Sequence, residues 1–152
     1  IGTLRRNLAT MRRLWHVEEV NGTNLRPVLA VRGGPPVLIG SWGGKRWIPW
    51  AAPEFDGWVA SAAHTGFNTL AESLNRYRDA GGKRAIVTNI SVALEADEPL
   101  DNAVGPFHLR TSPGVAAERL QRLVELGFDD AVLVHRGQSE ADLSVLRGLL
   151  GR

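Results

Sequence analysis

Strand-like and helix-like segments alternate along the sequence, and this alternation is what most constrains the fold. Four short apolar runs, rich in β-branched residues, are expected to be buried strands over residues 37–39, 57–60, 84–94 and 130–135. Apolar residues recur at helical spacing before, between and after these runs. A helix between consecutive strands favours parallel pairing through right-handed crossovers. We therefore expect four parallel strands that are neighbours in the order in which they occur.

Turn and capping residues mark the ends of several of the expected helices. Ser112 and Pro113 form a helix start, with an N-cap residue followed by proline at the first helical position. Pro53 is expected to stop an apolar helix because proline lacks the backbone N–H that helices use. The five expected helices cover residues 3–15, residues 45–55, residues 67 to the Gly-Gly pair at 81–82, residues 113–127, and residues from 139 onward.

Four parallel strands fit either a small open sheet or half of a (β/α)8 barrel. The chain has 152 residues, whereas a full barrel needs roughly 250 residues. We treat residues 1–152 as one α/β domain, since this length can bury a single core. The segment from Glu95 to Thr111 is expected to be a polar loop with a solvated acidic cluster.

Composition excludes several classes of function. The net charge of +2 does not indicate a nucleic-acid partner. No apolar run is long enough to cross a membrane. The absence of cysteine excludes disulfides and thiolate chemistry, and it fits a cytoplasmic location. His16, His64, His108 and His135 lack the spacing of metal ligands, so we expect no metal site.

The turn that follows the first expected strand is the strongest candidate for a binding site. Its residues are Gly40, Ser41, Trp42, Gly43, Gly44 and Lys45, with Arg46 next. Glycine tolerates positive φ and leaves backbone N–H groups uncovered, Ser41 adds a hydroxyl donor, and the two cations add positive charge. These features suit a phosphate group at the start of a helix. An ordinary strand–helix turn is the alternative interpretation, and Trp42 fits packing better than stacking on a cofactor.

No catalytic residue is identified from spacing. His64 and His135 each follow an expected strand, where barrel enzymes place functional groups. A structural or solvent-facing role is nevertheless the favoured interpretation for both histidines. The sequence offers no arrangement of serine, histidine and aspartate that supports nucleophilic catalysis.

The order of several short motifs resembles the C-terminal half of the bacterial luciferase-like monooxygenase family. The motifs are Pro36-Val37-Leu38-Ile39-Gly40-Ser41, then Ala51-Ala52, Asp56-Gly57-Trp58, Ser112-Pro113 and the run Leu126–Val134 that includes Gly127-Phe128-Asp129. The resemblance implies that the four strands are the fifth to eighth of a TIM (β/α)8 barrel. It implies that residues 3–15 form the helix after the fourth strand.

The same resemblance implies flavin chemistry. Members of the family bind reduced FMN or the deazaflavin coenzyme F420, and the turn after the fifth strand holds the cofactor phosphate. This assignment falls on Gly40, Ser41, Trp42, Gly43 and Gly44, beside Lys45. The chain would then be an oxidoreductase that oxidises or reduces a small organic substrate, as a homo-oligomer or paired with the missing barrel half. The alternative is a non-catalytic half-barrel module that assembles with itself or with a partner chain.

Overall fold

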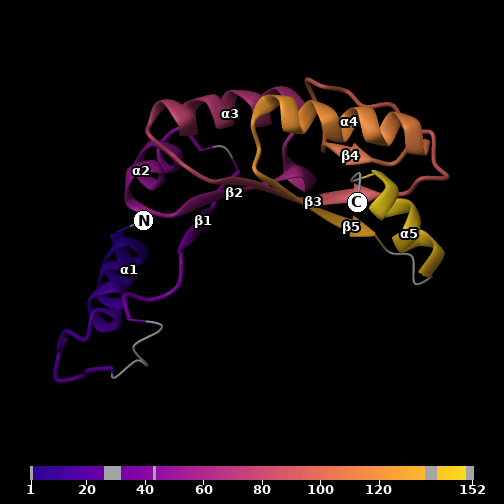
Figure 1. The fold of residues 1–152 in the computed structure, drawn as a ribbon. Coiled ribbons are helices and arrows are strands. Elements are labelled where there is room, and N and C mark those ends of the chain that lie inside the picture. The colour runs from indigo at the N-terminus through magenta and orange to yellow at the C-terminus, as the bar shows by residue number, and fades with distance from the viewer. Residues whose placement is uncertain (1, 26–31, 43, 136–139, 150–152) are drawn as a thin grey trace. The chain divides into compact units, whose positions relative to one another are not determined.

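The computed structural model describes residues 2–25, 32–42, 44–135 and 140–149, with only the backbone described for 140–143 (Figure 1). The chain divides between Pro36 and Val37 into two compact units, and each is described here by itself.

The first unit contains the helix α1, Gly2–Trp15, and the turns that follow it. The helix was predicted, but no residue of α1 is buried, so the apolar stripe that includes Leu4 and Met11 covers no core within the described residues. Gly34 has a φ of +83° and lies against the ring of Trp15, where an added Cβ would come within 2.3 Å of the ring. Glycine at this position is therefore required both by conformation and by space.

The second unit is built on a parallel sheet, as the alternation predicted. The strands β1 (Leu38–Gly40), β2 (Gly57–Ser61), β3 (Ala85–Val92) and β5 (Asp130–His135) pair in this order, and every pair is parallel. Parallel strands place all their carboxyl ends at one edge of the sheet. The sheet therefore has one edge where functional loops can gather.

A fifth strand was not predicted. β4, His108–Leu109, lies in the segment that we expected to be a polar loop, and it pairs in parallel with the end of β3. Ser91 and Val92 pair with both β4 and β5, which therefore lie on opposite edges of β3. β2 pairs with the edge of β3 that lies opposite β5. β4 pairs with that same edge of β3, beyond the point where β2 ends. Both residues of β4 are buried, so the loop prediction is wrong only for the last part of the segment. Residues 95–106 include no buried residue, and Glu95, Asp97 and Asp101 are exposed, as predicted.

The helices cover one face of the sheet. α3 (Phe67–Asp79) and α4 (Pro113–Leu126) lie side by side on that face (Figure 1). α2 (Trp47–Glu54) follows β1, the short 3₁₀ helix η2 (Ala62–His64) follows β2, and α5 (Glu140–Leu149) follows β5. The predicted start of the last helix, Ser139, lies outside the described residues.

The expected helix ends agree with the structure in position. α4 begins at Pro113 and ends at Leu126, and Gly127 follows with a φ of +97°, the left-handed conformation that glycine favours after a helix. Ser112 occupies the N-cap position, but its hydroxyl makes no capping hydrogen bond. α2 includes Pro53 and ends one residue later, at Glu54, close to the expected stop; the N–H of Phe55 still donates to the carbonyl of Ala51 (3.0 Å).

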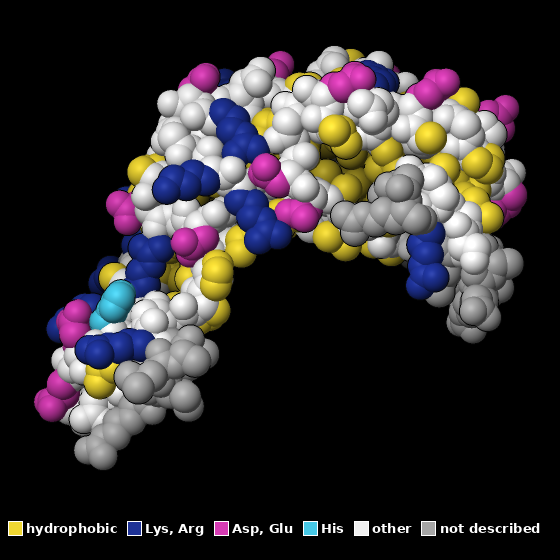
Figure 2. Space-filling model, in the orientation of Figure 1, with side chains coloured by type: hydrophobic (Ala, Val, Ile, Leu, Met, Phe, Trp, Pro, Cys, Tyr) yellow, Lys and Arg dark blue, Asp and Glu magenta, His cyan; other side chains and the backbone are white. Residues whose placement is uncertain are grey.

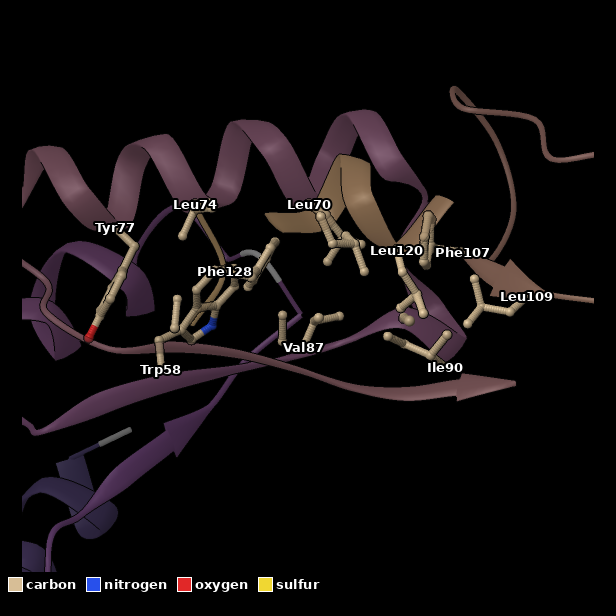
Figure 3. Packing of buried hydrophobic residues seen from close by; sticks show 14 of the residues in the cluster. Trp58, Leu70, Leu74, Tyr77, Val87, Ile90, Phe107, Leu109, Leu120 and Phe128 are labelled. Atoms are coloured by element: carbon tan, nitrogen blue, oxygen red, sulfur yellow. The ribbon is translucent and has the colours of Figure 1, made fainter. Parts of the chain in front are cut away.

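The core lies between α3, α4 and the sheet. Trp58 and Tyr77 are fully buried, with ring centroids 5.6 Å apart, and Phe128 lies 6.0 Å from Trp58 on its other side. Figure 3 shows these rings below α3, with Leu70, Val87 and Ile90 continuing the same layer. This packing holds the strands in register under the helices.

A β-bulge interrupts β3. Strict alternation along this strand would place Ile86, Thr88 and Ile90 on one face and Val87 on the other, but Val87 and Ile90 are both buried because the register shifts between them. Asn89 lies at the shift with a φ of +59° and is exposed. The extra residue reverses the alternation of side chains beyond it.

Two aspartates tie the amino ends of neighbouring strands by the same pair of hydrogen bonds. Asp56, just before β2, donates its N–H to the carbonyl of Val37 (2.9 Å) and accepts the N–H of Val37 on its carboxylate (2.7 Å). Asp129, just before β5, makes the same two bonds to Ala85, at 2.9 and 2.7 Å. We call these pairs the carboxylate clasps. Each joins a strand to its neighbour where both begin.

The clasp at Asp129 is reinforced by charge. Arg78 donates to the carboxylate of Asp129 (2.9 Å) and to the carbonyl of Gly127 (2.8 Å). Burial alone would raise the pKa of Asp129, but the Ala85 N–H and Arg78 outweigh it and hold this pKa below its ordinary value. The charged form is therefore the one that the folded chain prefers.

Replacing Asp129 by asparagine should destabilise the fold in a pH-dependent way. Because the pKa of Asp129 is lower in the folded chain than in the unfolded chain, its contribution is complete above the unfolded pKa and is lost as pH falls through the folded pKa. We expect Asp129→Asn to lose about 1–2 kcal/mol of unfolding free energy at pH 7, since both partners are partly exposed. Urea unfolding at pH 7 and pH 3 measures this loss. Glu118→Gln, at an exposed site on α4, is the control, and an equal loss at both pH values would contradict the assignment.

Candidate functional site

The carboxyl ends of β1, β2 and β3 bring together polar and aromatic side chains from three loops. In parallel α/β folds this is the edge at which ligands bind. The indole N–H of Trp58 donates to the carbonyl of Ser41 (3.2 Å), which fixes the start of the turn after β1. Trp42 was expected to pack in the core, but it is 69% exposed, and its ring lies 4.6 Å from the ring of His64 at an interplanar angle of 38°. We take this edge as the candidate site.

The glycine-rich turn differs in detail from the expected cradle. Gly40 pairs with Val59 at the end of β1, and the N–H of Ser41 donates to the carbonyl of Val59 (3.0 Å), so this N–H is not available to a ligand. Neither Gly40 nor Gly44 adopts the left-handed backbone that we expected the turn to need. Gly43 lies outside the described residues. The turn is therefore partly an ordinary extension of the sheet.

Other donors of the turn remain open. The carbonyl of Gly44 accepts the N–H groups of Trp47 and Ile48 (both 3.2 Å) and so begins α2. An added Cβ on Gly44 would lie 3.7 Å from the hydroxyl of Ser41, so the missing side chain leaves space beside that hydroxyl. Lys45 is exposed, and its N–H donates to no carbonyl in the described part of the chain. The turn thus carries one hydroxyl, one open backbone N–H and one positively charged side chain.

Asn89 is a site residue that the sequence analysis missed. Its side-chain amide donates to the hydroxyl of Ser61 (3.1 Å), linking the bulge of β3 to the carboxyl end of β2. Its positive φ is uncommon for a residue other than glycine, and such conformations concentrate at functional sites. Asparagine inside a run of β-branched residues was the available signal, because it is depleted in strands and tolerates the left-handed region.

The histidines have separate surroundings. His64 lies in the site, exposed and next to Trp42, whereas His135 ends β5 as expected. His108 is buried in β4, where its Nδ1 accepts the N–H of Arg110 (3.3 Å). Burial, and then the nearby guanidinium of Arg119, lower the pKa of His108, so the neutral ring is favoured. Within the described residues, no group of three histidine or acidic side chains is placed so that it could hold a metal ion.

Arg119 explains why the acidic segment is ordered. Its side chain is 8% exposed and donates to the carbonyls of His108 (3.2 Å) and Glu98 (2.9 Å). Glu98 in turn pairs with Arg110 at 2.7 Å. These bonds hold residues 98–110 against α4, so Glu98 has a structural role and is not a candidate acid or base.

The described part of the second unit includes two hollows of similar size, and one of them belongs to the candidate site. It has a volume of about 390 Å³ and lies between Trp42 and His64, the start of α3, and the loop 103–106. The other, also about 390 Å³, lies below α4, where Figure 2 shows hydrophobic side chains gathered. Asp129 and Asp130 line that second hollow, and both are held in ion pairs with arginines. We therefore assign a structural role to the polar groups of the second hollow.

Comparison with known proteins supports the fold. No family model matches the chain, and no curated protein does. The crystal structure of apo-MsnO8 is similar over 98% of this chain and 59% of that one, with a TM-score of 0.67 and 16% sequence identity. The chain therefore spans about 59% of the length of that structure. This likeness shows a parallel α/β fold and no more. No helix in the described ranges has the length and apolar character needed to cross a membrane.

Proposed function

We propose that the chain binds reduced FMN or coenzyme F420 and serves an oxidoreductase that acts on a small organic substrate. The observation that carries the proposal is the turn after β1: Gly44 leaves space beside the Ser41 hydroxyl, and the exposed Lys45 has an N–H that donates to no carbonyl in the described part of the chain. The sequence resemblance to the luciferase-like family supports the same assignment. Phosphate is the part of both cofactors that such a turn recognises.

Only some of the residues expected to hold a phosphate are suited to do so in the structure. Ser41 supplies its hydroxyl, Gly44 leaves the space beside it, and Lys45 supplies charge. Gly40 ends β1, and the ring of Trp42 contacts the ring of His64. When bound, the flavin supplies the hydride or oxygen chemistry, while these residues bind and orient it.

The sheet edges support a further part of the proposal, namely that the strands are the fifth to eighth of a (β/α)8 barrel. β1 pairs with β2 and β5 pairs with β3, and neither has a second partner strand in the described part of the chain. Open strand edges attract further strands. We propose that a second copy or another chain supplies these strands. A non-catalytic module that assembles through the same edges is the second candidate function.

Light scattering tests the open edges directly. We expect the purified chain to associate with itself, because two unpaired edges and one uncovered sheet face remain. A stable monomer that binds no partner chain would contradict the half-barrel assignment.

Ser41→Ala tests the flavin assignment separately. We expect FMN to bind more tightly than riboflavin, which lacks the phosphate, and Ser41→Ala to weaken FMN binding by about ten- to a hundredfold because one charge-assisted hydrogen bond is lost. Riboflavin binding should not change. Fluorescence titration of both ligands measures the difference, and Ser112→Ala, which removes an exposed hydroxyl far along the chain, is the matched control.

Two results would count against the phosphate assignment. One is equal affinity of the wild type for FMN and riboflavin. The other is an unchanged FMN affinity in Ser41→Ala. Either would favour the non-catalytic module, provided that the variant keeps the thermal stability of the wild type.

A further inference from the structure

We propose that the hollow beside Trp42 and His64 binds an uncharged, planar aromatic ring. If this hollow is the substrate pocket of an oxidoreductase, the substrates are neutral aromatic molecules; this part of the inference rests on the proposed function. As a ring-binding site it can be tested without any flavin.

Trp42 is the first observation that carries this inference. Its side chain is 69% exposed, whereas Trp58 is fully buried in the core. Leaving an indole ring in water forgoes the favourable free energy of burying it. Trp42 is held next to His64 by ring contact and also lines the hollow. An exposed and positioned aromatic side chain at the mouth of a hollow is suited to stacking on a ligand ring.

The opposite wall of the hollow is held in place before any ligand binds. The carboxylate of Asp101 accepts the N–H groups of Ala103 (2.8 Å) and Val104 (3.3 Å). The N–H of Asn68 donates to the carbonyl of Asn102 (3.0 Å), and this bond fastens the loop to α3. A pre-formed wall lowers the cost of ordering residues around a ligand.

Gly66 seals the contact between this wall and the start of α3. An added Cβ on Gly66 would lie 2.9 Å from the carbonyl oxygen of Gly105, so the two backbones approach as closely as the missing side chain allows. Phe107, just after the wall, donates its N–H to the carbonyls of Ala62 (3.1 Å) and Thr65 (3.2 Å). The loop therefore joins η2 and α3 into one rim.

The chemistry of the lining selects an uncharged ligand. The residues that line the hollow include no aspartate, glutamate, lysine or arginine. Their polar side chains are the hydroxyls of Thr65 and Thr69 and the imidazole of His64. A charged ligand would lose hydration without gaining an opposite charge, whereas a neutral ring with one polar substituent could stack and form a hydrogen bond. The volume of about 390 Å³ lies within the range of small-molecule pockets, roughly 300–1,000 Å³.

Calorimetric titration with 2-naphthamide and 2-naphthoate tests the proposal. These probes have the same two-ring shape, but one is neutral and the other is an anion at pH 7. We expect the neutral amide to bind the wild-type chain more tightly than the carboxylate. Trp42→Leu should weaken amide binding by about tenfold, because the apolar volume remains and the ring is lost, while Trp42→Phe should stay within about threefold of the wild type.

His64→Leu is the second variant and removes the other ring of the pair. It should also weaken the amide, by a smaller factor than Trp42→Leu. Trp50→Phe is the control, because the contacts of Trp50 with Trp47 and Phe55 lie outside the hollow. Thermal unfolding of each variant verifies that the fold is kept, which the exposure of Trp42 leads us to expect.

The proposal is overturned if the wild type does not bind the amide, if the carboxylate binds more tightly, or if Trp42→Leu binds the amide as the wild type does. None of these results depends on flavin. A Trp42-dependent amide site together with no preference for FMN over riboflavin would keep the pocket and remove the oxidoreductase assignment. The reverse pair of results would keep the phosphate site and remove the pocket.

Discussion

The arrangement of the second unit depends on the carboxylate clasps at the amino ends of its strands. Asp56 and Asp129 each bind both backbone groups of one residue on the neighbouring strand, Val37 and Ala85. The first N–H of a strand otherwise has no ladder partner, and a buried, unpaired N–H is costly. By satisfying it, each clasp fixes the register of two strands from one end. The opposite ends then meet at a common edge, where Ser41, His64 and Asn89 lie.

This separation of roles changes what the sequence motifs mean. The aspartates of Asp56-Gly57-Trp58 and Gly127-Phe128-Asp129 contributed to the family resemblance, yet in the structure both carboxylates hold the sheet together. Trp58 of the first motif is a core residue whose indole N–H also fixes the turn at Ser41. The residues of these motifs therefore stabilise the fold. The chemistry of the site depends on residues at the carboxyl ends of the strands.

The sequence predicted those parts of the fold that local patterns determine. The four main strands are short β-branched runs, and α4 has proline at its start and glycine at its end, so their positions agree with the structure. β4 was missed because its order comes from Arg119, which binds carbonyl groups far along the chain. The bulge at Asn89 was missed because the pattern of apolar residues continues on both sides of Asn89 without a visible break. Within the site, the position of the turn agrees with the prediction. The hydrogen bond from the Ser41 N–H to Val59 was not predicted, because it depends on the register between β1 and β2.

The central claim is that ligands bind at the carboxyl edge of the sheet and that the amino edge is structural. Amide NMR spectra recorded during an FMN titration test it most directly, because each backbone N–H reports on its own surroundings. The account predicts that the largest shift changes fall on residues 41–46 and extend to residues 61–65 and 88–89, with Arg78 and Asp129 unchanged. Largest changes at Asp129, or at Leu123 and Phe128 in the hollow below α4, would contradict it.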